Sequence, residues 1–193
     1  MKKVYLLGDS IRMGYEPFVR QKMTGLADIF SPSENCKFAQ FTLRYLHEWA
    51  EKINCQNEID LVHWNNGLWD VLHQFEDECL TPPGYYADTL KRIYKRIRIV
   101  FPNAKIIFAL STPVIEEKFN LKNLYRINRD IIEYNDIASQ IMKELDVPVN
   151  DLFAAAGNFT AVQYSDATHF TEEGYEILAN AVVEFCESHL KNK

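Results

Sequence analysis

The sequence has no long apolar run, no paired cysteine motif and no excess of positive charge, and each absence excludes a class of protein. No stretch approaches the roughly 18 apolar residues that a membrane-spanning helix needs. Lysine and arginine number 21 against 27 aspartates and glutamates, which gives a net charge of −6. Because an acidic surface repels phosphate backbones, we expect no nucleic-acid partner. Because no apolar run is long enough, we expect no membrane span.

The cysteines and histidines lack the spacings of metal or redox motifs. The four cysteines are widely separated and contain no Cys-x-x-Cys pair, so free thiols are expected. His63, His73 and Asp70 do not complete a recognisable zinc pattern, so we expect no metal and no cofactor. Lys2-Lys3 leads straight into a short strand-like run without the apolar region or cleavage site of a secretory signal, which favours a cytoplasmic protein.

Length and composition predict one globular domain over residues 1–193. The chain is 47% hydrophobic and 25% charged, close to the globular average and unlike a disordered protein. It contains no internal repeat, low-complexity segment or linker. Nothing in the sequence indicates an oligomeric state.

Apolar periodicity predicts strands that alternate with helices along the chain. Strands are expected over residues 3–7, 27–31, 59–64, 104–110 and 147–152. Helices are expected over residues 11–24, 38–53, 86–101 and 121–145, and a last helix follows an N-cap at Thr171. About 15 residues after Gly67 are expected to be loop. This alternation predicts an α/β fold with about five mostly parallel strands, covered by helices on both faces.

Ligands of such sheets bind outside the carboxyl ends of the strands, which directs attention to three short segments. Ser10 follows the first strand, Asn65-Asn66 follows the middle strand, and Asp166 and His169 precede the last helix. Acyl transfer needs a hydroxyl nucleophile, an imidazole base, a carboxylate to orient it and donors for an oxyanion. Taken alone, each residue is read more readily in a structural role: Ser10 as a helix N-cap, His169 as a loop residue and Asp166 as a turn former.

Two of these segments resemble the blocks of the SGNH, or GDSL-type, hydrolase family of serine esterases and lipases. Gly8-Asp9-Ser10-Ile11 resembles the first block and Asp166-Ala167-Thr168-His169 resembles the last. The resemblance covers nearly the whole chain. It implies a flavodoxin-like, three-layer α/β/α fold and a metal-free triad in which Ser10 attacks, His169 moves the proton and Asp166 orients the imidazole.

The middle blocks depart from the family pattern. The second block lacks the glycine whose amide helps form the oxyanion hole, and Ala39 or Gln40 occupies that region. The third block normally reads Gly-x-Asn-Asp. Here we expect Asn66 to be the side-chain donor, with Asn65 as the alternative; in the register Gly67-x-Trp69-Asp70, Trp69 replaces the donor. The expected oxyanion hole therefore comprises the Ser10 amide, an amide near Gln40 and the Asn66 side chain.

The expected function is hydrolysis of a small carboxylic ester through an acyl-enzyme, with an O-acetylated carbohydrate as one substrate class. Side chains that could line the substrate pocket are Arg12, Tyr15, Trp64 and Trp69, although ordinary packing explains the aromatic residues equally well. A lysophospholipase or acyl-thioester hydrolase is the enzymatic alternative. The degenerate middle blocks leave a non-catalytic, ligand-binding member of the fold as a further alternative.

Overall fold

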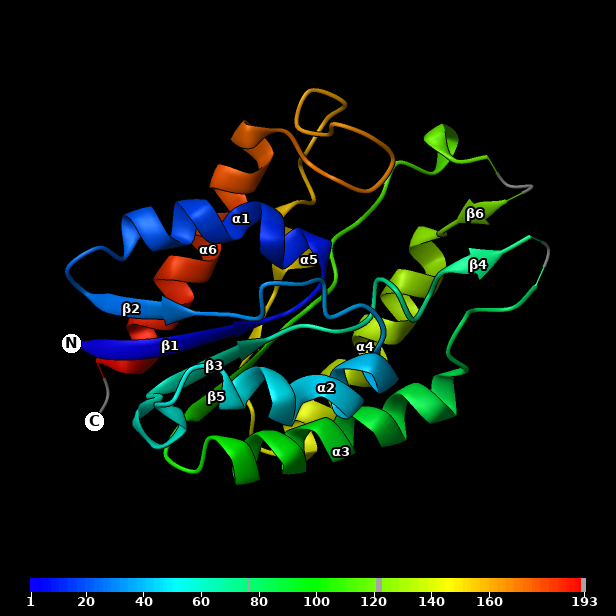
Figure 1. The fold of residues 1–193 in the computed structure, drawn as a ribbon. Helices are drawn as coiled ribbons and strands as arrows, with labels where there is room; N and C mark the ends of the chain where they lie inside the picture. Colours follow the sequence, from blue (N-terminus) through cyan, green and yellow to red (C-terminus); the bar gives the residue numbers. More distant parts are fainter. Residues whose placement is uncertain (76, 121–122, 192–193) are drawn as a thin grey trace.

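A computed structural model of the protein describes residues 1–75, 77–120 and 123–191. The central sheet has five parallel strands in the order β2-β1-β3-β5-β7. Their bounds are β1 (Lys2–Leu7), β2 (Ala27–Phe30), β3 (Leu61–Trp64), β5 (Lys105–Ala109) and β7 (Val149–Asn150). The predicted parallel α/β architecture is confirmed (Figure 1).

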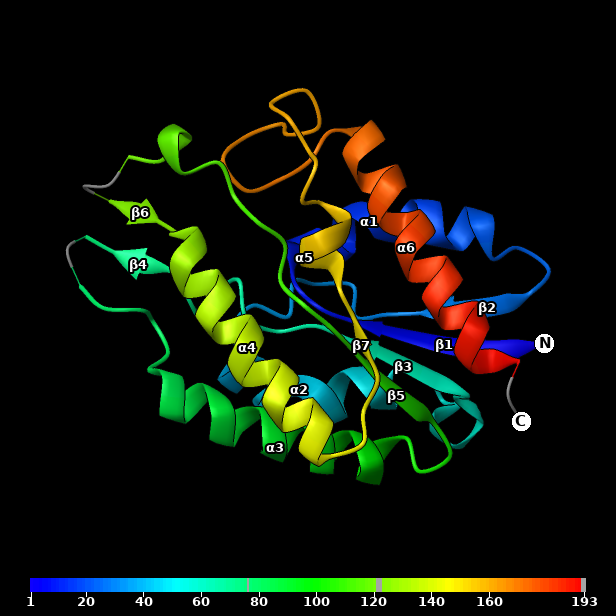
Figure 2. The ribbon, with the colours of Figure 1, turned by 180° about the vertical axis from the view of Figure 1, so that it is seen from behind.

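Helices form a layer on each side of this sheet (Figures 1 and 2). One layer contains α1 (Ser10–Lys22), the short α5 (Leu152–Ala155) and α6 (Glu172–Leu190). The other contains α2 (Ala39–Glu51), α3 (Pro83–Val100) and α4 (Asn128–Glu144). Within the described residues, no helix is long and apolar enough to cross a membrane.

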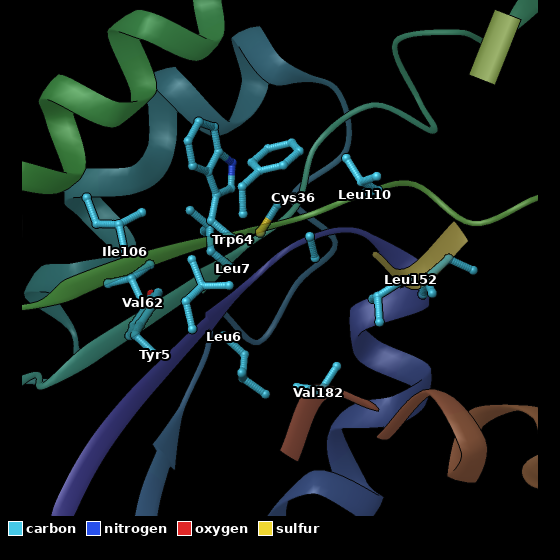
Figure 3. Packing of buried hydrophobic residues seen from close by; sticks show 14 of the residues in the cluster. Tyr5, Leu6, Leu7, Cys36, Val62, Trp64, Ile106, Leu110, Leu152 and Val182 are labelled. Atoms are coloured by element: carbon cyan, nitrogen blue, oxygen red, sulfur yellow. The ribbon is translucent and has the colours of Figure 1, made fainter. Parts of the chain in front are cut away.

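The central strands are apolar because both of their faces are covered by helices. All four residues of β3 are buried, and Tyr5, Leu6 and Leu7 of β1 are fully buried. Figure 3 shows Tyr5 and Leu7 on the same face of the sheet as Val62 and Trp64 of β3, and Leu6 on the opposite face, toward Val182 of α6. The packed core fixes the carboxyl ends of β1 and β3, where the polar segments predicted from the sequence begin.

A small second sheet, which the sequence did not predict, changes two of the predicted elements. β4 (His73–Gln74) lies in the expected loop and pairs in antiparallel fashion with β6 (Leu124–Tyr125). The helix expected over 121–145 therefore begins only at Asn128, whose side chain bonds the backbone N–H and carbonyl of Val114. Residues 121–122 of that prediction lie outside the described residues.

Two other elements begin or end at residues different from the predicted ones, and each difference has a local cause. Pro83 occupies the first turn of α3, where its missing N–H costs nothing, so this helix begins before residue 86. The strand expected over 147–152 shortens to β7, because the Asp151 carboxylate accepts from Ala154 N at 2.8 Å and opens α5. The predicted N-cap at Thr171 is confirmed, since its hydroxyl accepts from Gly174 N at 3.4 Å.

Candidate active site

Ser10 is the first residue of α1, and its hydroxyl is not used to cap the helix. The N-cap is Asp9, whose Oδ1 accepts from Ile11 N at 2.9 Å. The reading of Ser10 as an N-cap is therefore wrong. The first amides of a helix have no acceptor within the helix, so the Ser10 N–H also lies at an end that favours negative charge.

His169 and Asp166 form a tightly connected pair on the loop that leads into α6. Asp166 Oδ2 lies 2.8 Å from His169 Nδ1, while Oδ1 accepts from the backbone N–H groups of Thr168 at 2.6 Å and His169 at 2.7 Å. Burial acts to raise the pKa of Asp166, but these hydrogen bonds outweigh it and hold the pKa below its usual value. The carboxylate is therefore fixed in place and ionised at neutral pH.

The structure brings Ser10, His169 and Asp166 together although the serine and the histidine are 159 positions apart. His169 Nε2 lies 2.9 Å from Ser10 Oγ. With Nδ1 facing the carboxylate, the imidazole presents its other nitrogen to the hydroxyl, which is the arrangement that general-base activation of a serine requires. The site is open, because the side chains of His169 and Asp166 are 39% and 57% exposed.

The two helices that carry this site pack directly against each other. A Cβ at Gly14 of α1 would lie 2.1 Å from the Tyr175 ring of α6, so only glycine allows this approach. Lys22 of α1 also pairs with Glu176 of α6 at 2.9 Å. Since Ser10 begins α1 and His169 immediately precedes α6, this contact sets the distance between hydroxyl and imidazole.

Asp9 places a buried carboxyl beneath the serine. Burial raises the pKa of Asp9, while the Ile11 amide and the charges of Arg126 and Arg12 act in the opposite direction. Asp9 lines a cavity of about 10 Å³ together with Tyr15, Ser111 and Thr112. Asp9 Oδ2 and the hydroxyl oxygens of the other three side chains have no hydrogen-bond partner among the described residues.

The side chain of Asn66 is not available as an oxyanion donor, which corrects the expectation from the sequence. Its Nδ2 donates to the Lys37 carbonyl at 3.1 Å and to Thr42 Oγ1 at 2.9 Å, so both N–H bonds are engaged. Its Oδ1 accepts from Trp64 Nε1 at 2.7 Å. Asn66 therefore joins β3 to the start of α2. The alternative, Asn65, uses its Nδ2 to donate to the Ala109 carbonyl at 2.8 Å.

The second block has its unusual backbone at Lys37 rather than at Ala39 or Gln40. Lys37 has a φ of 51°, in the left-handed region that favours glycine. The Ala39 N–H donates to both carboxylate oxygens of Asp70, at 3.0 and 3.2 Å, and so cannot serve an oxyanion. The Gln40 side chain accepts from Thr81 Oγ1 at 3.3 Å. Only the Gln40 backbone amide, in the first turn of α2, stays a prediction.

Of the four residues expected to line a substrate pocket, Arg12 and Tyr15 line the cavity beside Asp9, whereas Trp64 does not line it and has a structural position instead, which corrects that expectation. Arg12 is 3% exposed, pairs with Glu16 and donates to the Glu34 carbonyl at 2.7 Å. Tyr15 is buried against the edge of the His63 ring. Trp64 is fully buried and packs edge-on to Phe108. Trp69 is half-buried, and its role in substrate binding stays a prediction.

Arg126 is a residue of this region that sequence reasoning missed. Its Nε donates to the Leu68 carbonyl at 2.5 Å, and its side chain interacts electrostatically with Asp9 and Asp166. Burial lowers the pKa of Arg126 to about 10, so the guanidinium remains charged at neutral pH. Among the described residues, none forms a hydrogen bond with its Nη groups. The periodic pattern placed Arg126 inside a helix, where nothing distinguished it from a surface arginine.

Comparison with known proteins identifies the family and the fold of this chain. The sequence profile of the GDSL-like lipase/acylhydrolase family matches residues 6–177. No protein of curated function matches the chain. Among solved structures, a lipase/acylhydrolase from Enterococcus faecalis has a TM-score of 0.79 at 19% identity, with 100% of this chain and 99% of that chain covered.

Two further solved structures with the same fold are esterases. An acetyl xylan esterase has a TM-score of 0.75 at 17% identity, with 95% of this chain and 98% of that chain covered. A carbohydrate esterase of family 3 from Talaromyces cellulolyticus has a TM-score of 0.73 at 19% identity, with both chains fully covered at 100%. At these identities the likeness establishes the shared fold.

Proposed function

Because this chain belongs to the GDSL-like lipase/acylhydrolase family of ester hydrolases, we propose that it is a serine esterase whose nucleophile is Ser10. The observation that carries the proposal is the continuous contact from Ser10 Oγ to His169 Nε2 at 2.9 Å and from His169 Nδ1 to Asp166 Oδ2 at 2.8 Å. Each atom lies where nucleophile, base and orienting carboxylate are needed.

The reaction proceeds in two halves. Ser10 Oγ attacks the ester carbonyl carbon while His169 Nε2 accepts the hydroxyl proton, and the tetrahedral species collapses as His169 returns that proton to the departing alcohol. This leaves an acyl-enzyme on Ser10. Water then attacks the acyl carbon with His169 again as base, which releases the carboxylic acid and restores the hydroxyl. Asp166 keeps Nδ1 protonated and stabilises the imidazolium in both halves.

The oxyanion is stabilised by a set of donors different from the expected one. The Ser10 amide at the start of α1 is one donor, and the Gln40 amide is a further candidate. Arg126 replaces the amide side chain expected from Asn66, because its Nη groups are free of bonds to described residues and its charge already acts on Asp9 and Asp166. A cation at this point stabilises developing negative charge more strongly than a neutral amide does.

The substrate is a small ester with a short acyl group. The cavity adjoining Asp9 and Ile11, on either side of Ser10, measures about 10 Å³, which accommodates roughly one water and no alkyl chain. The exposed His169 and Asp166 leave the alcohol half of the ester free to be large and polar. The half-buried Trp69 ring beside Arg126 suits a sugar face, and two solved structures of this fold are carbohydrate esterases by name. We therefore favour an O-acetylated carbohydrate over a lysophospholipid or acyl thioester.

Active-site labelling followed by a substrate survey tests this proposal. A fluorophosphonate probe should modify one serine, identified as Ser10 by peptide mapping, and should abolish hydrolysis of p-nitrophenyl acetate in proportion. kcat/KM should fall steeply from acetate to octanoate esters, and acetate should be released from acetylated xylan. Failure of both labelling and turnover would support a non-catalytic, ligand-binding protein, whereas a preference for octanoate or for lysophospholipid would overturn the short-acyl assignment alone.

A further inference from the structure

A second cluster of reactive side chains lies where the small sheet meets the start of α4. His73 of β4, Cys79 of the following turn and Asp130 in the first turn of α4 bring their terminal atoms within 4.8 Å of one another. His73 Nε2 is 2.7 Å from Asp130 Oδ2 and 3.4 Å from Cys79 Sγ. Cys79 Sγ is 3.9 Å from Asp130 Oδ2. None of the three contacts the Ser10 site.

The hydrogen bonds of His73 determine which of its nitrogens is free to bind a ligand. Nδ1 lies 2.9 Å from the Asp77 carbonyl, and since a carbonyl only accepts, Nδ1 carries a hydrogen. In a neutral imidazole, Nε2 then presents a lone pair toward the Asp130 carboxylate oxygen. An imidazole nitrogen and a carboxylate oxygen this close have either a proton or a metal ion between them, and the Cys79 thiol that faces the same nitrogen favours the metal ion. Bonding of the distal ring nitrogen to a carbonyl is also the usual support of a metal-binding histidine.

Neighbouring residues hold the other ligand atoms in the same direction. Asp130 Oδ1 accepts a hydrogen bond from Arg129 Nε and forms an ion pair with Arg129 Nη2, both at 3.1 Å, which leaves Oδ2 directed at His73. The His73 ring stacks on Tyr125, with centroids 4.8 Å apart and planes 6° from parallel. A backbone bridge between His73 and Cys79 fixes the thiol beside the imidazole. The cluster is therefore organised by four separate contacts.

The geometry excludes a second nucleophilic triad. In such a triad the carboxylate binds one ring nitrogen and the nucleophile binds the other. Here Cys79 and Asp130 both face Nε2, and Nδ1 is engaged by a backbone carbonyl. The imidazole cannot pass a proton from the thiol toward the carboxylate. Three donors that converge on one point instead define a coordination site.

We propose that His73 Nε2, Cys79 Sγ and Asp130 Oδ2 bind a zinc ion. Zinc combines imidazole, thiolate and carboxylate ligands, and bonds of about 2.0–2.3 Å place tetrahedral ligand atoms roughly 3.3–3.7 Å apart. The separations from Cys79 already lie close to that range, and the short contact between His73 and Asp130 lengthens as the ion enters. The fourth position faces a cavity of about 270 Å³, which Glu78 and Glu133 also line.

Zinc at this position would fasten β4 and its turn to α4. Tyr125, which stacks on His73, immediately precedes Arg126, so the ion also stabilises the segment that carries the guanidinium to the Ser10 site. Its role is therefore structural. Metal binding raises the free energy of unfolding in proportion to the logarithm of the zinc concentration above the dissociation constant.

Cobalt and zinc titrations of chelator-treated protein test the proposal. Cobalt(II) should bind at one equivalent and give the intense visible bands of a tetrahedral site together with a thiolate charge-transfer band in the near ultraviolet. Equimolar zinc should abolish both sets of bands. Zinc should also raise the Tm and protect one thiol from a colorimetric thiol reagent. Cys79→Ser should remove the charge-transfer band and Asp130→Asn should weaken cobalt binding at least tenfold, whereas Cys55→Ser, which changes another partly buried free cysteine, should leave the spectrum unchanged.

The titration of the wild-type protein tests the zinc site without any variant, so it still decides the question where a variant fails to fold. Absence of a cobalt–thiolate band, or zinc that leaves the Tm and thiol reactivity unchanged, would overturn it. Equal loss of the band in Cys55→Ser and Cys79→Ser would place the metal elsewhere and would also overturn it.

Discussion

The guanidinium carbon of Arg126 lies 5.9 Å from the centre of the Trp69 ring. In the register Gly67-x-Trp69-Asp70, the tryptophan occupies the place of the family's donor asparagine. In that register, a cation from a distant segment lies beside the ring that stands in place of the donor. The guanidinium also interacts electrostatically with Asp9 and Asp166, on either side of the contact between Ser10 and His169, which is why we propose that it acts on the oxyanion.

Replacing Arg126 should reduce the chemical step. If its Nη groups contact the oxyanion, Arg126→Gln should lower kcat about 10²–10³-fold with little change in KM, and Arg126→Lys should recover part of the loss. Steady-state kinetics on p-nitrophenyl acetate measure this, with Arg92→Gln on the exposed surface of α3 as the control. A rise in KM with unchanged kcat would show that Arg126 binds the substrate equally in the ground state.

Asn66→Ala should cost stability rather than turnover. The substitution leaves Trp64 Nε1 and Thr42 Oγ1 without their partner in the interior, and each such loss costs about 1–3 kcal/mol. Urea unfolding should show a lower midpoint, while kcat of the folded fraction should stay within a few fold of wild type. The exposed Asn103→Ala variant is the control. A stable Asn66→Ala protein with kcat reduced a hundredfold would restore Asn66 as the oxyanion donor.

Ser10→Ala should abolish ester hydrolysis and leave the Tm unchanged. The hydroxyl is the proposed reacting atom, and Asp9 rather than Ser10 caps α1, so its removal deprives the helix of nothing. Comparison of activity and thermal unfolding with the surface variant Ser33→Ala tests both halves. Retained activity with a lowered Tm would mean that Ser10 is structural.

His169→Ala and Asp166→Asn should reduce kcat by different amounts, and the pH dependence of kcat/KM should show which group takes up a proton. His169→Ala should reduce kcat about 10²–10⁴-fold, and Asp166→Asn should cost less because the imidazole still contacts the hydroxyl. The lowered pKa of Asp166 means that this carboxylate remains ionised as the pH falls through its ordinary range. The acid limb of kcat/KM should therefore contain no proton taken up by Asp166. Two protons on that limb would contradict an ionised Asp166.

Asp70 should make stability depend on pH in a direction unusual for a carboxylate. Burial raises its pKa from 3.8 to about 7, against the hydrogen bond from Ala39 N, so the folded state binds a proton before the unfolded state does. The unfolding free energy of wild type relative to Asp70→Asn should then increase as the pH falls from about 7 to 4. The limiting change is on the order of 4 kcal/mol, at about 1.4 kcal/mol per pH unit between the two pKa values.

Urea unfolding at several pH values measures this difference, and Asp136→Asn on the exposed side of α4 serves as the control. The comparison with Asp70→Asn is needed because His63 acts in the opposite direction. Burial lowers the pKa of His63 to about 4, so its contribution favours folding as the pH rises from 4 to 6.5. A pH-independent difference between wild type and Asp70→Asn would show that Asp70 is ionised in the fold.

The sequence predicted the parts of the structure that depend on local patterns. Alternating apolar segments predicted the parallel sheet, and the carboxyl ends of such strands meet at one edge, which is why Ser10 was expected near the loop of His169. The spacing of Asp166 and His169 predicted their contact because three residues of loop span that distance. Each of these inferences started from a local pattern, and only the predicted topology of the sheet related Ser10 to the distant loop of His169.

The remaining features depend on contacts that no local pattern contains. Asn66 was expected to face the oxyanion, but its partners Lys37 and Thr42 lie 29 and 24 positions away and both bind its amide. The sequence did not predict a site role for Arg126, because apolar periodicity predicted a helix through the segment that pairs with β4. The cluster around His73 combines residues 6 and 57 positions apart, a spacing that matches no zinc motif.

The 159 positions between Ser10 and His169 also bear on when hydrolysis can begin during synthesis. A ribosome that adds about 5–20 residues per second needs roughly 8–30 s to extend the nascent chain from the serine to the histidine. In the proposed mechanism, the Ser10 hydroxyl has no base until α6 packs on α1 through Gly14 and Tyr175. Translation then supplies the proposed nucleophile first and its base last, and we expect a polypeptide that stalls before residue 169 to lack esterase activity.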